Sequence, residues 1–261
     1  MQVFGLHGIV RWQPPTGYAS WWNVCRSLVV LALPLGVTEL FWTSGTFLYN
    51  VVFRQIGDDA LAAAQIVNML EALFLVGSIG LMSATTALVG RDVGRGDACG
   101  AAAWVRRIKK AGTVTGVGFG LLYGATALLV PFLFADTTDE VRAVACAGIL
   151  LYAVAQVVKV RNTILGAGVL PSAGDVRGVI MGDVVGAFGV GLPLAVVLGL
   201  HTRLGVLGVF AARVVEELAK VVIFSRRTRQ VRWEALAEPS RTPEDVSPRV
   251  AGEVDELTEP A

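Results

Sequence analysis

Six long apolar blocks, separated by short polar loops, constrain this chain more than any other feature of its sequence. Each is close to the roughly 20 residues that an α-helix needs to cross the hydrocarbon core of a bilayer. Hydrophobic residues fill 54% of the 261 positions and charged residues only 16%, whereas a soluble domain carries about 25% charged residues. A single core could not bury so much apolar surface, so lipid must solvate part of it. The blocks are 27–53, 61–89, 111–135, 141–158, 178–200 and 204–224.

These blocks predict an all-α integral membrane protein, a six-transmembrane-helix bundle whose first partner is the lipid bilayer. We expect residues 1–26 to form a cytoplasmic N-terminal or connector segment and residues 27–225 the six-helix lobe. Residues 226–261 are first basic, then acidic and proline-rich, which predicts a cytoplasmic tail. Lys and Arg gather between the second and third blocks and after the sixth, and short loops rich in these residues stay inside the cell. Both termini are then cytoplasmic, in a multi-pass plasma-membrane protein.

Patterns typical of enzymes and of nucleic-acid binding are missing from the sequence. It contains no HExxH, GxSxG or P-loop motif, and its three cysteines and two histidines lie at scattered positions. That spacing indicates neither a disulfide framework nor a zinc site. No basic stripe with interleaved aromatic residues is present. We therefore expect no enzymatic activity, no catalytic residues, no metal site, no nucleic-acid partner, and no cofactor other than a coupling ion.

Carboxyl groups inside the apolar blocks are candidates for function, because a charge in lipid is costly. Glu39 lies 12 residues into the first block, about 18 Å along a helix and close to the membrane midplane. Glu71 lies at a similar depth, and Asp183 lies nearer the cytoplasmic end. A low dielectric favours the protonated carboxyl, so all three are candidate sites for a coupling proton or Na⁺. Alternatively, each could be a protonated carboxyl bonded to a neighbouring helix, or one that faces a water-filled cavity.

Uncharged side chains inside the blocks are candidates for substrate binding: Trp42, Tyr49, Asn68, Gln156 and Asn162. Hydrogen bonds between helices could equally satisfy most of them, and Trp42 could simply fill space.

The sixth block differs, because its charges can neutralise one another. Four-residue spacing predicts the ion pairs Arg213–Glu217 and Glu216–Lys220, and such a set favours a structural role. We expect Lys159, at the end of the fourth block, to extend toward the lipid headgroups.

Glycines recur at every fourth position in two blocks, at 112, 116, 120 and 124 and at 178, 182 and 186. This spacing places small residues on one helix face, where another helix can approach closely.

Three loop segments, taken in order, resemble those of the multidrug and toxic compound extrusion (MATE) family. They are IGDDALAA at 56–63, GRDVGRGD at 90–97 and GAGVLPSAGDVR at 166–177. Pro34 and Glu39 in the first block, and Arg232 and Trp233 after the sixth, also match the family in position. The likeness runs from about residue 27 to residue 233, and the order of the motifs around six blocks is specific.

The resemblance implies that the chain is one lobe, the second, of a MATE-type transporter with two six-helix halves related by an axis along the membrane normal. It implies secondary active efflux of drugs and toxic, often cationic, organic compounds by antiport with protons or Na⁺. The family's carboxylate in the first helix of this half maps onto Glu39. A second acidic residue, found in the fourth helix of some members, has no counterpart, and Gln156 or Asn162 could replace it.

The length of the chain leaves its partner and its function open to alternatives. The lobe could pair with a separate first half or with a second copy of itself, or it could be a truncated product. A flippase for lipid-linked sugars from the same superfamily is one alternative, and it predicts a more cationic interior than the mostly acidic one expected here. An inactive half, or a membrane scaffold, is the other.

Overall fold

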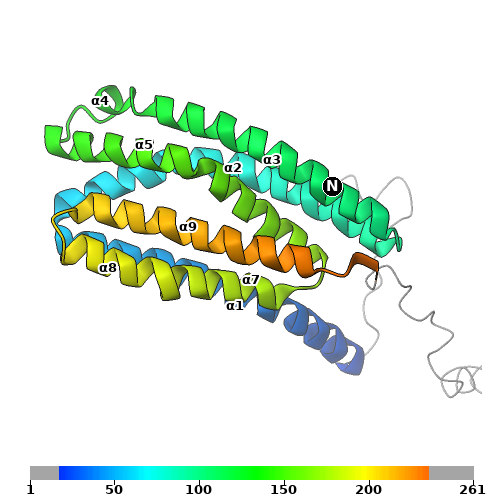
Figure 1. Ribbon diagram of the computed structural model, residues 1–261. Helices are drawn as coiled ribbons and strands as arrows, with labels where there is room; N and C mark the ends of the chain where they lie inside the picture. Colours follow the sequence, from blue (N-terminus) through cyan, green and yellow to red (C-terminus); the bar gives the residue numbers. More distant parts are fainter. Residues whose placement is uncertain (1–17, 235–261) are drawn as a thin grey trace, which may run out of the picture.

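The computed structural model describes residues 18–234, which form an all-α bundle of long helices lying side by side (Figure 1). The all-α fold predicted from the apolar blocks is confirmed. Parts of the expected terminal segments, residues 1–17 and 235–261, lie outside the described residues. The elements are α1 (Tyr18–Ile56), α2 (Asp58–Gly94), α3 (Ala98–Thr126), α4 (Val130–Leu133), α5 (Asp139–Asn162), η1 (Thr163–Val169), α6 (Leu170–Ser172), α7 (Val176–Asp183), η2 (Val184–Gly191), α8 (Leu192–Leu200) and α9 (Gly205–Gln230).

Within residues 18–234, three continuous helices are long and apolar enough to cross a membrane by length and composition: Asp58–Gly94, Asp139–Ser172 and Val176–Leu200. The second joins α5, η1 and α6, and the third joins α7, η2 and α8. Helices α1, α3 and α9 cover the other three predicted blocks, and their crossing of the membrane stays a prediction. The third block differs from its expected bounds of 111–135, because α3 ends at Thr126 and a turn leads into α4. Pro131 in α4 has no N–H to continue the helical ladder.

The glycine face of α3 is one of the close helix contacts that the sequence predicted, and the structure places it against α5. A Cβ added at Gly116 would lie 2.7 Å from the Cα of Val157, and one added at Gly120 would lie 2.6 Å from the carbonyl oxygen of Ala153. The two backbones therefore meet without side chains between them, which maximises their van der Waals contact.

The two Gly-Asp loop segments have the same local structure at the same end of the bundle. Gly96 and Gly174 adopt φ values of 73° and 74°, in the left-handed region that favours glycine. Asp97 and Asp175 follow them and cap α3 and α7, each accepting a hydrogen bond from the backbone N–H three residues later. The conformation therefore explains why these loops need glycine followed by aspartate.

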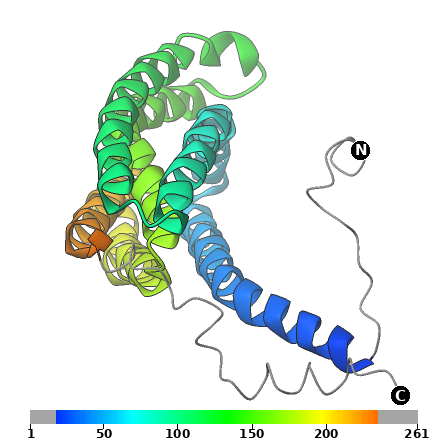
Figure 2. The same cartoon turned by 90° about the vertical axis from the view of Figure 1, so that its right-hand side faces the viewer.

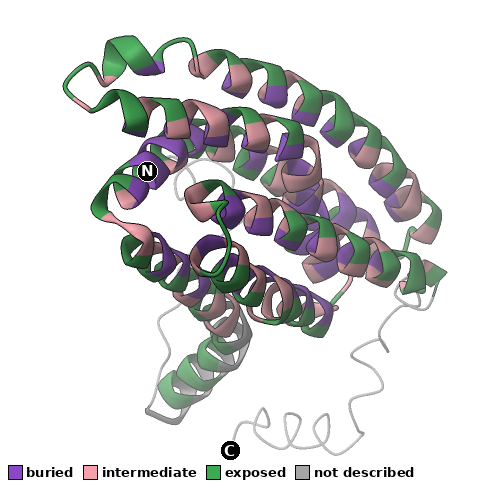
Figure 3. Ribbon diagram, turned by 60° about the vertical axis from the view of Figure 1, so that its left-hand side comes forward, coloured by how far each residue is buried: buried purple, intermediate pink, exposed green. Residues whose placement is uncertain are grey.

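Buried residues lie where the helices face one another, and exposed residues cover the outside (Figure 3). The buried apolar residues of the described part of the chain form two clusters. One surrounds Phe53, Tyr152 and Phe210, and the other surrounds Ile164 and Phe224. Along both α5 and α9, polar residues separate the two clusters. The first part of α1 projects away from the bundle (Figure 2).

Candidate functional site

A polar layer of buried and half-buried residues between the two apolar clusters is the candidate site. Helical spacing produces it, because residues three or four positions apart share one face. Positions 159 and 162 of α5 lie beside positions 213 and 217 of α9. Position 156 of α5 meets a side chain of α2, and positions 216 and 220 of α9 meet side chains of α1 and α7. The layer consists of Tyr49, Glu71, Gln156, Lys159, Asn162, Asp183, Arg213, Glu216, Glu217 and Lys220.

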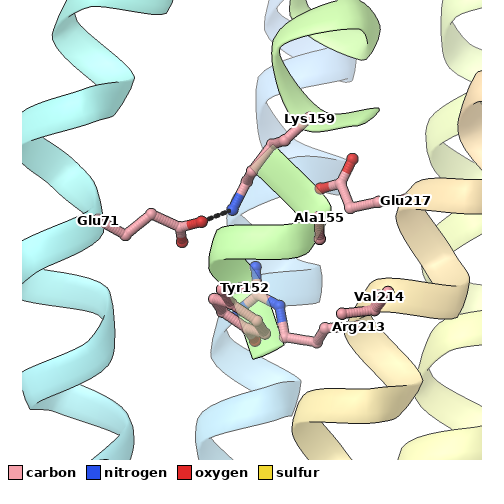
Figure 4. A pocket seen from close by; sticks show the side chains of 7 residues that line it. All are labelled: Glu71, Tyr152, Ala155, Lys159, Arg213, Val214 and Glu217. Carbon is pink, nitrogen blue, oxygen red and sulfur yellow. Dashed lines mark hydrogen bonds and ion pairs between the residues drawn. The ribbon is translucent and has the colours of Figure 1, made fainter. Parts of the chain in front are cut away.

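An ion pair between Glu71 and Lys159 joins α2 to α5 (Figure 4). The Lys159 Nζ lies 2.6 Å from Glu71 Oε1, and Gln156 Nε2 donates to the same oxygen at 3.3 Å. The ammonium of Lys159 also lies 5.5 Å from the centre of the Tyr152 ring, where the electron-rich face attracts a cation. The expectation that Lys159 extends toward the headgroups is therefore wrong. A buried carboxylate on the neighbouring helix holds its ammonium inside the bundle.

Lys220 joins α9 to α7 and, through Glu216, to α1. Its Nζ lies 2.6 Å from Glu216 Oε1 and 3.6 Å from Asp183 Oδ1. The hydroxyl of Tyr49 donates to Glu216 Oε2 at 2.5 Å. Gly186 leaves room for the Lys220 side chain, because a Cβ at Gly186 would lie 2.5 Å from it. The predicted Glu216–Lys220 pair is confirmed.

The other predicted pair of the sixth block, Arg213–Glu217, is not among the ion pairs of residues 18–234. Arg213 instead places its guanidinium 4.9 Å from the centre of the Tyr49 ring. Glu217 accepts a hydrogen bond from Asn162, whose Nδ2 lies 2.7 Å from Oε2 and 2.8 Å from the backbone oxygen of Glu217. The prediction fails because helix packing turns the two side chains toward different neighbours.

A small cavity opens between α2, α5 and α9 inside this layer (Figure 4). Its volume of about 10 Å³ is close to the smallest that can hold one water molecule. A single water or a small ion fits there, whereas a drug-sized compound does not. The cavity is lined by Glu71, Tyr152, Ala155, Lys159, Arg213, Val214 and Glu217.

The charges of the layer nearly balance. Four carboxyl groups (Glu71, Asp183, Glu216 and Glu217) face three cations (Lys159, Arg213 and Lys220). If all seven were ionised, the layer would carry one excess negative charge. The expectation of a mostly acidic interior is therefore wrong for this layer.

Five of the eight predicted site residues meet in the layer: Tyr49, Glu71, Gln156, Asn162 and Asp183. The other three do not join it. Glu39 and Trp42 are exposed on α1, and Asn68 is half-buried on α2. The functional roles assigned to all eight stay predictions.

The sequence favours a structural role for four charged members of the layer, Arg213, Glu216, Glu217 and Lys220, and it places Lys159 at the headgroups. Their helical spacing is a sequence signal for this layer. It gives the fourth and sixth blocks polar faces of matching length, and two such faces can pack against each other. The partners across helices, however, could not be assigned from spacing alone.

Several known proteins are similar to this chain. Residues 34–197, more than half of its length, match the MatE family profile. A "Probable multidrug resistance protein NorM" from Brucella suis biovar 1 is 30% identical over 199 residues, which cover 72% of this chain and 41% of that protein. A protein of the same name from Xanthomonas campestris pv. campestris is 29% identical over 213 residues, covering 80% and 45%. The chain thus spans less than half the length of these relatives.

Solved structures share the fold at lower sequence identity. An outward-facing multidrug resistance MATE family transporter of the MOP superfamily superposes with a TM-score of 0.73 at 17% identity, covering 82% of this chain and 48% of that one. The eukaryotic MATE transporter AtDTX14 superposes with a TM-score of 0.71 at 17% identity, covering 84% and 49%. The bundle therefore has the fold of about half of such a transporter.

Proposed function

This chain belongs to the multidrug and toxic compound extrusion (MATE) family, and we propose that it acts in secondary active efflux of small organic compounds, often cationic, across the plasma membrane. The family match supports transport rather than enzymatic chemistry. The names of the curated relatives support drugs as the substrate class. With both termini in the cytoplasm, as the positions of the basic residues favour, the polar layer would lie within the membrane.

The observation that carries this proposal is the polar layer itself, with four carboxyl groups and three cations. One excess negative charge in a low dielectric favours uptake of one cation. Protonation of a carboxyl would neutralise the layer, and release of that proton would restore the excess charge. The layer can therefore alternate between two charge states, as a coupled transporter requires.

The ion pairs of the layer favour a proton over Na⁺ as the coupling ion. The ammonium groups of Lys159 and Lys220 already form ion pairs with the carboxylates of Glu71 and Glu216, each at 2.6 Å. A Na⁺ ion would have to displace an ammonium or lie beside it, and both are unfavourable. A proton needs neither, because it binds a carboxylate oxygen directly.

Lys159 has a second carboxylate across the cavity, which provides a way to transmit protonation. Its charge also attracts Glu217 on α9, and both side chains line the cavity (Figure 4). When Glu71 takes up a proton, its attraction for Lys159 falls, and the ammonium can turn toward Glu217. This exchange would weaken the contact between α2 and α5 and strengthen that between α5 and α9.

A second lobe is part of the proposal, because the chain spans only 41–46% of the length of its curated relatives. Exposed apolar side chains on α1 and α2 offer a surface for it: Leu40, Trp42, Phe47, Met69, Leu73 and Val76. The partner is either a separate first half or a second copy of this chain. Glu39 and Trp42, both exposed on α1, would then face a substrate held between the two lobes.

The flippase alternative predicts cations that are free to bind phosphate. Lys159 and Lys220 are instead paired with carboxylates, and Arg213 lies against an aromatic ring. The layer therefore supports proton-coupled export better than binding of a lipid-linked phosphate.

Reconstitution into liposomes tests the proposal. We expect a pH gradient to drive accumulation of a fluorescent organic cation such as ethidium, and a Na⁺ gradient at equal pH to drive none. Glu71→Gln should abolish the accumulation, whereas Asp59→Asn, at an exposed carboxylate of the same helix, should preserve it. Glu39→Gln should also reduce it if that carboxyl faces the substrate.

Two results would reject parts of the proposal. Accumulation driven by Na⁺ at equal pH would reject proton coupling. A helical, folded preparation that accumulates nothing under either gradient would reject export by this chain alone and favour the inactive half.

A further inference from the structure

A basic face covers one end of the helix bundle. The ends of α2 and α9 and the starts of α3 and α7 lie together there (Figure 1). Trp104 of α3 and Trp233, just after α9, pack against the same apolar cluster. Arg227 of α9 also lies 3.8 Å from Asp175, the residue that caps α7. We define the basic face by six exposed side chains at this end: Arg95, Arg106, Arg107, Lys110, Arg229 and Arg232.

The described part of the chain gives these six cations no carboxylate partner. The cations in ion pairs within residues 18–234 are Arg91, Arg142, Lys159, Lys220 and Arg227. Carboxylates near the basic face are already engaged, since Asp92 and Asp175 lie in ion pairs of their own and Asp97 caps α3. Like charges on one face repel one another, so an anionic partner would stabilise this end of the bundle.

The segment that follows α9 carries the opposite charge. Residues 235–261 contain seven carboxylates, two arginines and no lysine, a net charge of −5. The carboxylates are Glu238, Glu244, Asp245, Glu253, Asp255, Glu256 and Glu259. This acidic tail is joined to the bundle beside the basic face, because Trp233 packs against the cluster there. A tethered segment has an effective concentration in the millimolar range, so weak ion pairs with the face can add up.

The depth of the basic face favours the acidic tail over lipid as its partner. Helix α3 begins at Ala98, 13 residues before the third apolar block at 111, which is about 20 Å along a helix. The headgroup layer is only about 5–8 Å thick on each side of the hydrocarbon core. Arg95, in the loop before α3, therefore lies beyond the lipid phosphates. A segment that starts at residue 235 can follow the face from the headgroups out to this loop.

We propose that the acidic tail, residues 235–261, docks on the basic face through ion pairs between its carboxylates and the six exposed cations. The docked tail connects the α2–α3 loop to the end of α9 and covers this end of the bundle. Salt opens the contact, because exposed ion pairs are screened. The docking does not depend on the transport activity proposed above.

Double electron–electron resonance spectroscopy on the purified full chain tests the docking. One spin label occupies Cys99, which is exposed at the start of α3, and T258C supplies the second site in a C25S/C146S background. We expect a narrow distance distribution at 0.1 M NaCl and a broad one at 1 M, where the screening length has fallen from about 10 Å to about 3 Å. Distributions of equal width at the two salt concentrations would overturn the proposal.

Two double variants locate the contact. An exposed ion pair changes an equilibrium constant by about two- to fivefold, so R106Q/R229Q on the basic face should lower the ratio of docked to free tail by about 4- to 25-fold. R54Q/R203Q removes two exposed cations at the opposite end, where α1 ends and α9 begins, and should change the ratio by less than about twofold. Equal losses in the two variants would replace the basic face with diffuse attraction to the whole chain.

Carbodiimide coupling in the unaltered chain needs no substitution, so it decides the question even if a labelled variant does not fold. The reagent joins a lysine to a carboxylate only where the two are in contact. We expect mass spectrometry to find Lys110 coupled to carboxylates of the acidic tail at 0.1 M NaCl, and far less of this product at 1 M. Absence of the product at 0.1 M NaCl would contradict the docking.

Nanodiscs distinguish the acidic tail from an anionic membrane surface as the occupant of the basic face. A tail that stays docked both in phosphatidylcholine and in mixed phosphatidylglycerol nanodiscs supports the proposal. Release of the tail by phosphatidylglycerol would assign the face to the anionic leaflet and overturn it. Because the readout is a distance, a failure of ethidium transport leaves this test unaffected.

Discussion

Adding one methyl group at Gly116 tests the close contact between α3 and α5. A Cβ there would lie 2.7 Å from the Cα of Val157 and 3.5 Å from the carbonyl oxygen of Gln156. Carbon atoms in contact lie about 3.5–4.0 Å apart, so α3 and α5 would have to separate by roughly 0.8 Å or more. Gly118, half a turn away on the same helix, has no atom within 4 Å of the position of its added Cβ.

Comparing the two alanine variants isolates the steric cost of the methyl group at Gly116 in the free energy of unfolding. Alanine in place of glycine stabilises a helix by about 1 kcal/mol, and this gain applies to both positions. Overpacking at Gly116 opposes it by about 1–3 kcal/mol. Gly118→Ala should therefore be neutral or stabilising, and Gly116→Ala should be less stable than Gly118→Ala by about 1–3 kcal/mol.

Reversible unfolding in mixed micelles, titrated with sodium dodecyl sulfate and followed by tryptophan fluorescence, measures this difference. The Gly116 variant should also disturb the Glu71–Lys159 pair, because Gln156 lies beside both the methyl group and Glu71. If the two variants unfold within 0.5 kcal/mol of each other, the close approach of α3 and α5 described here is wrong.

Three further predictions concern the polar layer and its support. Glu71→Gln and Lys159→Met should each destabilise the protein, while the double variant costs less than their sum by about 1–3 kcal/mol in a double-mutant cycle of unfolding free energies; additivity would contradict the 2.6 Å pair. Tyr49→Phe should lose about 1–2 kcal/mol with its hydrogen bond to Glu216, whereas Tyr152→Phe, whose buried hydroxyl has no partner among residues 18–234, should be neutral or stabilising in the same titration. Asp175→Ala should lower stability by about 1 kcal/mol and raise hydrogen exchange at the start of α7, because it removes the cap on Gly178; unchanged exchange there would show that the cap contributes nothing.

The sequence alone determined the elements that depend on local chemistry. A run of apolar residues long enough to span lipid forms a helix, since only a helix satisfies its own backbone there. Glycine at every fourth position of α3 predicted a close helix contact, and Gly116 and Gly120 make one. The ordered loop motifs were enough to identify the family, because each needs a specific backbone conformation, as Gly96 and Gly174 show.

Only the tertiary structure decided which charged groups meet. Spacing along one helix predicted the Glu216–Lys220 pair correctly, because both partners lie on α9. It could not pair Glu71 with Lys159, which are 88 residues apart, and it wrongly paired Arg213 with Glu217.

The physical reason is that the rotation of each helix about its axis depends on how all of its neighbours pack. This rotation decides whether a side chain faces lipid or a neighbouring helix. Packing against α2 and α9 therefore placed Lys159 inside the bundle, and no local pattern in its own helix could show this.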